Sequence, residues 1–391
     1  MELTIGIIVG IVVLLFLVVV HELGHAIVAK RNGVKVKEFG VGFPPKATSK
    51  KVKQSFLGKN VEFSVNWLPI GGFVRLQGEY DSADKKGDYG AASYWVKTKI
   101  LFAGVVMNWL VAAILLTILA IVGMPKILDN QFSIASDTRT VVERSAEITV
   151  VDVQEASPAA TAGLQQGDKL KKVGNQTIET SDQVTQSLTE HAGGDVQIAV
   201  ERDGELRTVI AKLRGESDKG LLGVSMTELR AQEKLYATWS APLVGVGTTA
   251  QLTGATFQGI GDMVAKLATG AVDRFSADET VREQGSQKMG EVSEGVAGPI
   301  GILGVIFPQM SQAGVGAVLF LAAIVSLSLA VMNVLPIPAL DGGRWFVTTI
   351  YKLRRKVLTR EKEENIQATG MLVLLGLIVL ITIADIGKVL R

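Results

Sequence analysis

The sequence contains no cysteine, and only three of its 391 residues are histidine. Without cysteine the chain can form neither a disulfide framework nor a thiolate metal site, so a metal would need histidine and carboxylate ligands. The chain also lacks an excess of either charge, because 40 Lys and Arg face 38 Asp and Glu and the formal net charge is +2. This balance lacks the basic excess typical of nucleic-acid binding, so we expect no nucleic acid partner.

Apolar residues, in contrast, are abundant and make up 48% of the chain. Four apolar runs are close to or longer than the roughly 20 residues that a helix needs to cross a bilayer. They are Leu3 to about Ala29, Ile100–Val122, Ala317 to about Leu335, and Met371 to about Ile386. We therefore expect a multi-pass α-helical membrane protein with about four transmembrane helices. The first run lacks a basic start and a small-residue cleavage site, which favours a retained span over a signal peptide.

Basic residues predict the orientation of these spans. Nine Lys and Arg lie between residues 30 and 59, directly after the first run, and YKLRRKVLTREK at 351–362 separates the last two runs. Loops rich in Lys and Arg tend to stay in the cytoplasm, so both loops are expected there. The amino terminus, residues 124–312 and the carboxyl terminus are then expected outside.

Two histidines and a glutamate interrupt the first apolar run, in the stretch VVVHELGHAIVAK at 18–30. An ionisable group inside a membrane costs roughly 3 kcal/mol or more, so we interpret these residues as functional. His21 and His25 are four residues apart and share one helix face, where two imidazoles can bind one metal. Glu22 is positioned to take a proton from a water on that metal, and HELGH is an instance of the HExxH zinc-hydrolase motif. The alternative is a pair of neutral core histidines bonded to backbone carbonyls, with Glu22 paired elsewhere.

A catalytic zinc site usually has about three protein ligands, so one more group is expected. His191 lies in the polar stretch TEHAGGD of the outer segment, where we expect a solvated surface residue. Asp341, in VMNVLPIPALDGGRW after the third apolar run, is the best-placed carboxylate. Pro336 and Pro338 precede it, and proline predicts a break in the helix that lets Asp341 lie at the depth of the two histidines.

Residues 148–214 of the outer segment have the pattern of a small α/β module. ITVVDVQ and DVQIAVERDGELRTVIAKL alternate like strands, the second with a DG turn, and TSDQVTQSLTEHAG has the pattern of a capped helix. With SPAA, AGLQQGD and GNQTI between them, these segments resemble a PDZ domain of the bacterial, circularly permuted type. PDZ domains bind an extended peptide at a sheet edge, and KGLLGVSM at 219–226 is a candidate carboxylate-binding turn. A module that acts only as a steric spacer is the alternative.

These motifs together resemble the site-2 protease family of intramembrane zinc metalloproteases, most closely its bacterial RseP-type branch. Besides HELGH and NVLPIPALDGG, the matching stretches are FGVGFPP at 39–45, WLPIGGFVRLQGE at 67–79, FAGVVMN at 102–108 and GVAGPIGI at 295–302. The chain departs from RseP itself in having one PDZ module rather than two. The resemblance implies that His21, His25 and Asp341 bind Zn²⁺ and that Glu22 is the catalytic base.

The resemblance also implies a location and a substrate class. It implies a multi-pass protein of the bacterial cytoplasmic (inner) membrane, with its active site towards the cytoplasm and the PDZ module outside. The expected substrates are single-span membrane proteins already trimmed on their outer side, such as anti-sigma factors, or remnant signal peptides. Either a peptide or a substrate's outer domain is the expected partner of the PDZ module, and the lipid bilayer surrounds the spans.

A transmembrane helix must unwind before its backbone can be hydrolysed, so we expect a strand that receives the substrate. Residues 61–76 alternate and turn at Gly71 and Gly72, which predicts a β-hairpin whose edge, including Phe73, contacts the substrate. Asn333, one turn before Pro336, is a further substrate contact by the resemblance, with a satisfied polar residue between helices as the alternative. Two other residues have less specific expectations: Gly24 either allows close helix approach or has no function, and Asn108 supports packing.

The expected organisation has four parts. Residues 1–123 form the first part of the membrane domain, with two spans, HELGH and cytoplasmic β segments, and residues 124–230 form the extracytoplasmic PDZ domain with linkers. Residues 231–312 form helices and a loop at the outer interface, and residues 313–391 complete the membrane domain. A zinc or proton carrier is disfavoured because no internal repeat is visible. A catalytically idle peptide-binding scaffold is disfavoured because HELGH and Asp341 are both intact.

Overall fold

The computed structural model describes residues 2–143, 148–178, 180–202, 204–215, 220–228, 232–276, 278–295 and 298–389. The chain folds into two compact units, and each is described by itself. Unit 1 consists of Met1–Met124, Leu128–Thr138 and Tyr236–Arg391, and unit 2 consists of Pro125–Ile127 and Arg139–Leu235.

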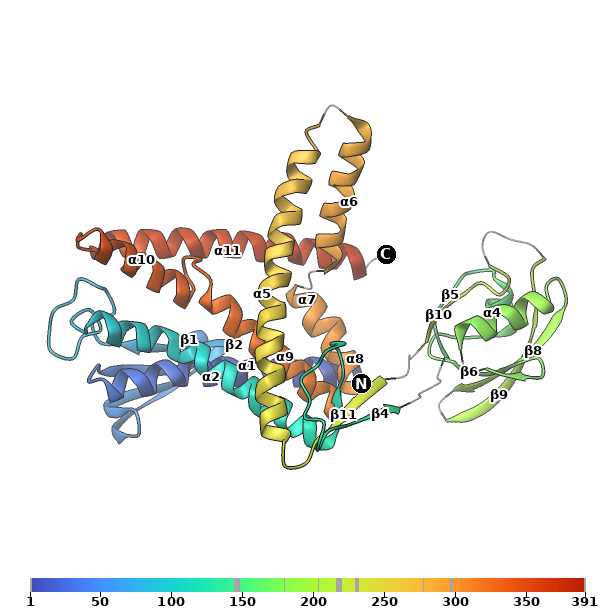
Figure 1. Cartoon of the computed structure of the whole chain (residues 1–391), viewed down its shortest axis with the longest axis horizontal. Coiled ribbons are helices and arrows are strands. Elements are labelled where there is room, and N and C mark those ends of the chain that lie inside the picture. The colour runs from blue at the N-terminus through green and yellow to red at the C-terminus, as the bar shows by residue number, and fades with distance from the viewer. Residues whose placement is uncertain are drawn as a thin grey trace. The chain divides into compact units, whose positions relative to one another are not determined.

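Four long apolar helices form the frame of unit 1 (Figure 1). They are α1 (Glu2–Arg31), α2 (Tyr94–Val122), α9 (Val315–Val334) and α11 (Arg360–Val389). Each is long and apolar enough to cross a bilayer, which confirms the four predicted apolar helices. The last helix begins at Arg360 rather than at the predicted Met371, because its polar first turns continue the helix and Glu363 is anchored to Arg344.

Helix α2 packs against α1, α9 and α5 (Ala241–Asp273). Ser93 caps it by accepting a hydrogen bond from the backbone N–H of Val96. A Cβ on Gly24 of α1 would lie 2.6 Å from the carbonyl oxygen of Ala103, so only glycine permits this approach of the two helices. Of the two interpretations of Gly24, close helix approach is therefore confirmed.

The chain breaks between α9 and α10 (Asp341–Leu353), as the two prolines predict. The six residues of the break include Pro336, Pro338 and Ala339, whose φ of 78° is left-handed. Asp341 is therefore the first residue of α10. This first turn is tightly packed on the break, since a Cβ on Gly343 would lie 1.9 Å from the carbonyl oxygen of Ile337.

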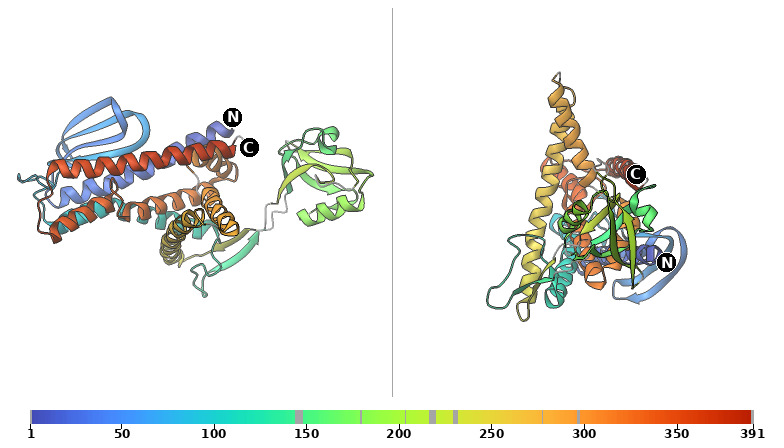
Figure 2. Two further views of the ribbon diagram at one scale, coloured as in Figure 1. Left: turned by 90° about the horizontal axis from the view of Figure 1, so that it is seen from above. Right: turned by 90° about the vertical axis from the view of Figure 1, so that its right-hand side faces the viewer.

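Strands β1 (Val36–Ser55) and β2 (Gly58–Leu76) form an antiparallel sheet that contacts α1 (Figure 2). Both strands bend, so each contributes two segments that pair separately within the sheet. Residues 58–66 pair with residues 46–55 and with residues 38–41, while residues 72–76 pair with the opposite edge of residues 36–41. The predicted hairpin within 61–76 is therefore wrong, because the first half of β1 lies between its two arms. Alternation along one segment shows which face is buried but does not show which strand is its neighbour.

A run of helices connects unit 2 back to α9. They are α5, α6 (Glu279–Gly295), α7 (Pro299–Gly301), the π-helical segment η1 (Ile302–Ile306) and α8 (Phe307–Gln312). Helix α5 crosses the common direction of α1, α2 and α11 instead of following it (Figure 1). Asp385, near the end of α11, accepts a hydrogen bond from the N–H of Gly301 at 2.8 Å and so ties the last span to α7. The placement of these helices at the outer membrane interface stays a prediction.

Unit 2 contains a sheet in the order β10–β5–β6–β8–β9, with β7 paired to β6. The strands are β5 (Ile148–Val153), β6 (Lys169–Val173), β7 (Gln176–Thr177), β8 (Asp195–Arg202), β9 (Glu205–Lys212) and β10 (Val224–Glu228), with helices α3 (Pro158–Ala162) and α4 (Ser181–Glu190). A further three-stranded sheet, β3–β11–β4, comprises β3 (Met124–Pro125), β4 (Arg139–Glu143) and β11 (Gln232–Tyr236).

Local sequence explains most of unit 2. Thr180 and Gln183 form a reciprocal capping box at the start of α4, as the helical pattern predicts. The end of the stretch at 219–226 lies in β10, which pairs with β5 at the sheet edge and contacts α4. Lys219, at the start of that stretch, and Asp203, in the predicted DG turn, lie outside the described residues. Burial disfavours the charge of Asp168, but hydrogen bonds from Arg202 hold its pKa below the usual range.

Candidate metal and catalytic site

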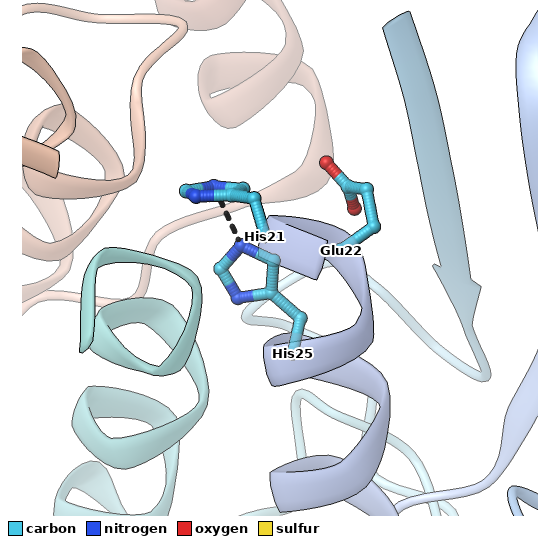
Figure 3. Close-up of side chains that lie close together, drawn as sticks. All are labelled: His21, Glu22 and His25. Atoms are coloured by element: carbon cyan, nitrogen blue, oxygen red, sulfur yellow. Dashed lines mark hydrogen bonds between the residues drawn. The ribbon is translucent and has the colours of Figure 1, made fainter. Parts of the chain in front are cut away.

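Helix α1 and the first residue of α10 bring two histidines and one carboxylate together. His21 Nε2 lies 3.0 Å from Asp341 Oδ2, and His25 Nε2 lies 3.3 Å from the same oxygen. The two Nε2 atoms are 3.1 Å apart, and Figure 3 shows the rings turned towards each other from successive turns of α1. Both histidines are less than 10% exposed. Three potential metal ligands from distant parts of the chain therefore converge on one point.

The geometry of this cluster fits a zinc ion. Bonds of about 2.1 Å in a tetrahedral arrangement place ligand atoms roughly 3.4 Å apart, close to the three separations observed here. Two imidazole nitrogens and a carboxylate oxygen that face one another are all potential lone-pair donors. A divalent cation between them satisfies all three groups at once, whereas a single shared proton satisfies only two.

The other ring nitrogens of both histidines are held by α2. His25 Nδ1 donates to the carbonyl oxygen of Ile100 at 2.7 Å, and Asn108 Nδ2 lies 3.3 Å from His21 Nδ1. Such contacts fix ring orientation and leave Nε2 free for a metal. A Cβ on Gly104 would lie 2.6 Å from Nε2 of both His21 and His25, so glycine is the residue that leaves room for the two rings.

Glu22 lies beside the cluster and is held differently from Asp341. Its Oε2 accepts a hydrogen bond from the backbone N–H of Val74 at 3.1 Å, so the sheet fixes the carboxylate. The ligand-type atoms of His21, Glu22 and His25 all lie within 4.8 Å of one another. In Figure 3 the Glu22 carboxylate points to the side of the two rings, towards a strand. The sheet therefore holds the Glu22 carboxylate next to the two histidine rings.

A polar cavity of about 490 Å³ lies on the Asp341 side of the cluster. Its lining includes Glu79, Asp341, Arg344, Glu363 and Gln367. Arg344 pairs with Glu363 at 2.9 Å, and the side chain of Asp341 is 21% exposed. Water can therefore approach the cluster from this side, which a hydrolytic site requires.

Three of the four predicted substrate-contact residues lie in strand β2, and the fourth lies in helix α9. Gly72 lies against α1, since its Cβ position is 3.6 Å from Val18 and 3.7 Å from Glu22. Gly71 lies under the ring of Phe43, and Phe73 packs its ring over Gly40 within the sheet. Asn333 donates to the carbonyl oxygen of Leu329 in its own helix at 3.0 Å. A substrate role for Gly71, Gly72, Phe73 and Asn333 stays a prediction.

Sequence reasoning missed two residues of the site. Asn108 was expected to support packing alone, and Gly104 was assigned no role, although both lie in FAGVVMN. They are four residues apart on α2, so they share the face that meets His21 and His25. A polar residue one turn from a glycine inside an apolar run was the available signal, because a buried amide in a membrane needs a partner.

Comparison with known proteins decides the family. The model for peptidase family M50 matches residues 9–377 of the chain. The chain belongs to peptidase family M50. This family comprises the site-2 proteases, and the M50 chain described here is accordingly a zinc metalloprotease of the membrane, with Zn²⁺ as its cofactor.

Bacterial relatives cover nearly all of this M50 protease. A Clostridium perfringens protein named as a zinc metalloprotease is 30% identical, over 95% of this chain and 95% of its own. Zinc metalloprotease RasP of Bacillus licheniformis is 25% identical, over 95% of this chain and 96% of its own. Regulator of sigma-W protease RasP of Bacillus subtilis is 23% identical over the same shares. Among solved structures, the PDZ domain of an SdrC-like protein from Listeria monocytogenes matches 23% of this chain and 94% of its own at 21% identity, with a TM-score of 0.20.

Proposed function

We propose that this M50 protease hydrolyses peptide bonds within or next to the transmembrane segments of single-span membrane proteins. The observation that carries the proposal is the position of the cluster. His21, Glu22 and His25 lie in the second half of α1, one of the four candidate spans, so the site belongs to the membrane part of unit 1. A protease site built into a membrane-spanning helix acts on substrates that reach it through the bilayer.

We assign His21, His25 and Asp341 as the zinc ligands and Glu22 as the base. When bound, zinc supplies Lewis acidity, which polarises the scissile carbonyl and makes water a better nucleophile at neutral pH. Val74 holds Glu22 Oε2, so we assign Oε1 as the atom that takes the proton of the attacking water and later delivers it to the leaving amine. Ile100 and Asn108 keep the imidazoles in the ligating orientation.

The sheet supports a role in holding an unwound substrate. Residues 72–76 pair with β1 on one edge, and their other edge faces α1 at Glu22, because Val74 donates to that carboxylate. An extended substrate next to this edge would present its backbone beside the proposed base. Gly71, Gly72 and Phe73 are the proposed contacts on this strand, and Asn333 is the proposed contact on α9.

We further propose that unit 2 restricts access to substrates that have already been trimmed, such as anti-sigma-factor-like proteins or remnant signal peptides. Its sheet edge at β10, flanked by α4, has the arrangement that PDZ-like domains use for peptides, so peptide capture is one possible mode. Size exclusion is the mode we favour, because an enzyme that cleaves unwound helices needs a filter that does not depend on the scissile sequence. The proposed orientation places this unit outside the cytoplasmic membrane.

The test compares membranes that contain the wild-type enzyme with membranes that contain Glu22→Gln. Proteomics should find membrane-embedded fragments that accumulate only with the variant, because the base is absent while the fold and the metal ligands remain. Fragments derived from soluble proteins, or identical peptide profiles, would exclude intramembrane proteolysis by this chain.

A further inference from the structure

A second cavity, of about 710 Å³, lies away from the zinc cluster, between the carboxyl end of α1 and the β1–β2 sheet. Its floor includes the buried residues Val34, Val36 and Leu57. Basic side chains dominate the lining, namely Lys30, Lys35, Lys37, Lys51, Lys59 and Arg75, and Glu62 is the acidic residue among them. The cavity therefore concentrates positive charge in a chain whose overall net charge is only +2.

The neighbouring carboxylates offset only part of this charge. Glu62 pairs with Lys46 at 2.8 Å, and the buried Glu38 pairs with Lys46 and Arg75. These contacts raise the pKa of Lys46 and lower that of Glu62. Within the described part of the chain, the remaining lysines of the lining have no carboxylate within 4.0 Å; they are Lys30, Lys35, Lys37, Lys51 and Lys59. Like charges held together in one concavity favour the binding of an anion.

The position of the cavity along α1 indicates the source of that anion. At the far end of the sheet, Phe43, Trp67 and Leu68 are 46%, 71% and 53% exposed, so large apolar groups face outward there. The sheet meets Val18 of α1 near that end, whereas the cavity is beside Lys30, twelve residues further and roughly 18 Å along the helix. Apolar groups beside the middle of a span and lysines at its end match the order of acyl chains and headgroups in a leaflet.

We propose that this cavity binds the phosphate of an anionic lipid headgroup, with Lys35, Lys37, Lys51 and Lys59 as its ligands. The same sheet holds Glu22 through Val74, so a lipid bound at the basic end fixes the sheet relative to the bilayer and to the site. The ligand comes from the membrane, and the chemistry it shares with free phosphate makes the two sources testable against each other.

The experiment uses the purified full chain in neutral detergent and phosphatidylglycerol labelled on an acyl chain, with binding followed by fluorescence anisotropy. Lys35→Gln/Lys37→Gln removes two charges from the cavity lining. Lys50→Gln/Lys53→Gln is the matched control, because it removes two charges from β1 at positions outside that lining. We expect the cavity variant to raise the Kd about 25-fold, roughly fivefold per lysine, and the control to change it by less than about threefold. Zinc content reports that each variant retains its fold.

The competitors separate the sources of phosphate. Unlabelled phosphatidylglycerol should displace the probe, while phosphatidylcholine, inorganic phosphate and glycerol 3-phosphate at millimolar concentrations should not. Displacement by inorganic phosphate at such concentrations would overturn the lipid source and assign the cavity to a soluble anion. Equal weakening in both double variants, or an unchanged Kd in the cavity variant, would overturn the site itself.

Discussion

At the residue scale, the two carboxylates near the histidines have different environments and therefore different assigned roles. One oxygen of Asp341 lies within 3.3 Å of Nε2 of both His21 and His25, whereas Glu22 Oε2 accepts a hydrogen bond from the backbone N–H of Val74. A ligand must contact the metal directly, while a base must stay off it and keep a free oxygen for the proton. This difference gives the four residues of the site two distinguishable mutant phenotypes.

The first prediction separates these phenotypes by zinc content. His21→Ala, His25→Ala and Asp341→Ala should each lower zinc in the purified protein well below one ion per chain, because each removes one of the three assigned ligands. Glu22→Gln should keep zinc near the wild-type level and lose proteolysis. Elemental analysis by mass spectrometry after dialysis measures the metal. Full zinc content in the Asp341→Ala protein would remove that residue from the ligand set.

The second prediction concerns the space around the two rings. Gly104→Ala should reduce both zinc content and activity by tenfold or more, about 1.4 kcal/mol in binding free energy at least, since its Cβ would lie 2.6 Å from both Nε2 atoms. Gly376→Ala on α11 is the control, because a Cβ there has no neighbour within 4 Å. Zinc binding by a competitive chelator assay compares the two. If Gly104→Ala bound zinc as tightly as Gly376→Ala, α2 would not set the geometry of the cluster.

The sequence revealed the part of the site that depends on local spacing and little of the rest. His21, Glu22 and His25 follow from a five-residue motif on one helix, and Asp341 follows from a proline break after an apolar run. For Asn108 and Gly104 the sequence offered only a polar residue one turn from a glycine, because their contact with the histidines depends on how α2 is rotated against α1. That rotation is set by close packing at Gly24 and Ala103, which no single-segment pattern contains.

At the element scale, the polar start of α11 joins three parts of the membrane unit. Glu363 accepts from Arg344 of α10 and from the backbone N–H of Asp81, and Gln367 accepts from the N–H of Ala339. Arg344 in turn contacts the ring of Tyr89, 4.7 Å from its centroid. These contacts clamp the segment that carries Asp341 against the loop that follows β2.

The third prediction tests this clamp with two adjacent glutamates. Glu363 is 3% exposed, so Glu363→Gln should destabilise the protein by up to about 3 kcal/mol, the lower end for breaking a buried ion pair. Glu364 pairs with Arg360 on the surface, so Glu364→Gln should leave the stability nearly unchanged. Thermal unfolding in detergent should therefore show a clearly lower Tm for the first variant only. Equal Tm values for the two variants would show that the clamp contributes no stability.

Elements were predictable where their contacts are local. The four apolar helices, the capped helix α4 and the hairpin formed by β8 and β9 follow from periodicity and turn residues. The order of strands beside α1 was predicted wrongly, because residues 36–41 insert between the two arms of 61–76 through a pairing that spans more than thirty residues. The early start of α11 was missed because its polar turns are stabilised by Arg344, a distant residue in the sequence.

At the scale of the whole molecule, the lack of native cysteine makes the orientation directly measurable. The fourth prediction is that a cysteine-reactive, membrane-impermeant reagent labels Asn32→Cys only from the cytoplasmic side and Gln176→Cys only from the outside. Both positions are exposed, and each variant carries a single thiol, so the reagent has one target. The physical reason is the cluster of Lys and Arg after α1, which resists translocation. Labelling of both positions from one side would overturn the four-span arrangement.

The fifth prediction concerns unit 2 and the choice of substrate. The sheet of this unit extends to Glu228, because β10 pairs with β5, so a clean deletion must remove residues 148–228 together. If the unit excludes bulky substrates, replacing these residues by a short flexible linker should permit cleavage of an untrimmed single-span substrate and leave the trimmed one cleavable. The same deletion with Glu22→Gln is the control that assigns any cleavage to this active site.

If the deletion abolished cleavage of the trimmed substrate while zinc content stayed at the wild-type level, capture of a peptide at the β10 edge would be the correct account. Zinc content at the wild-type level in either case would show that the change in cleavage comes from the loss of unit 2 and not from damage to the metal site.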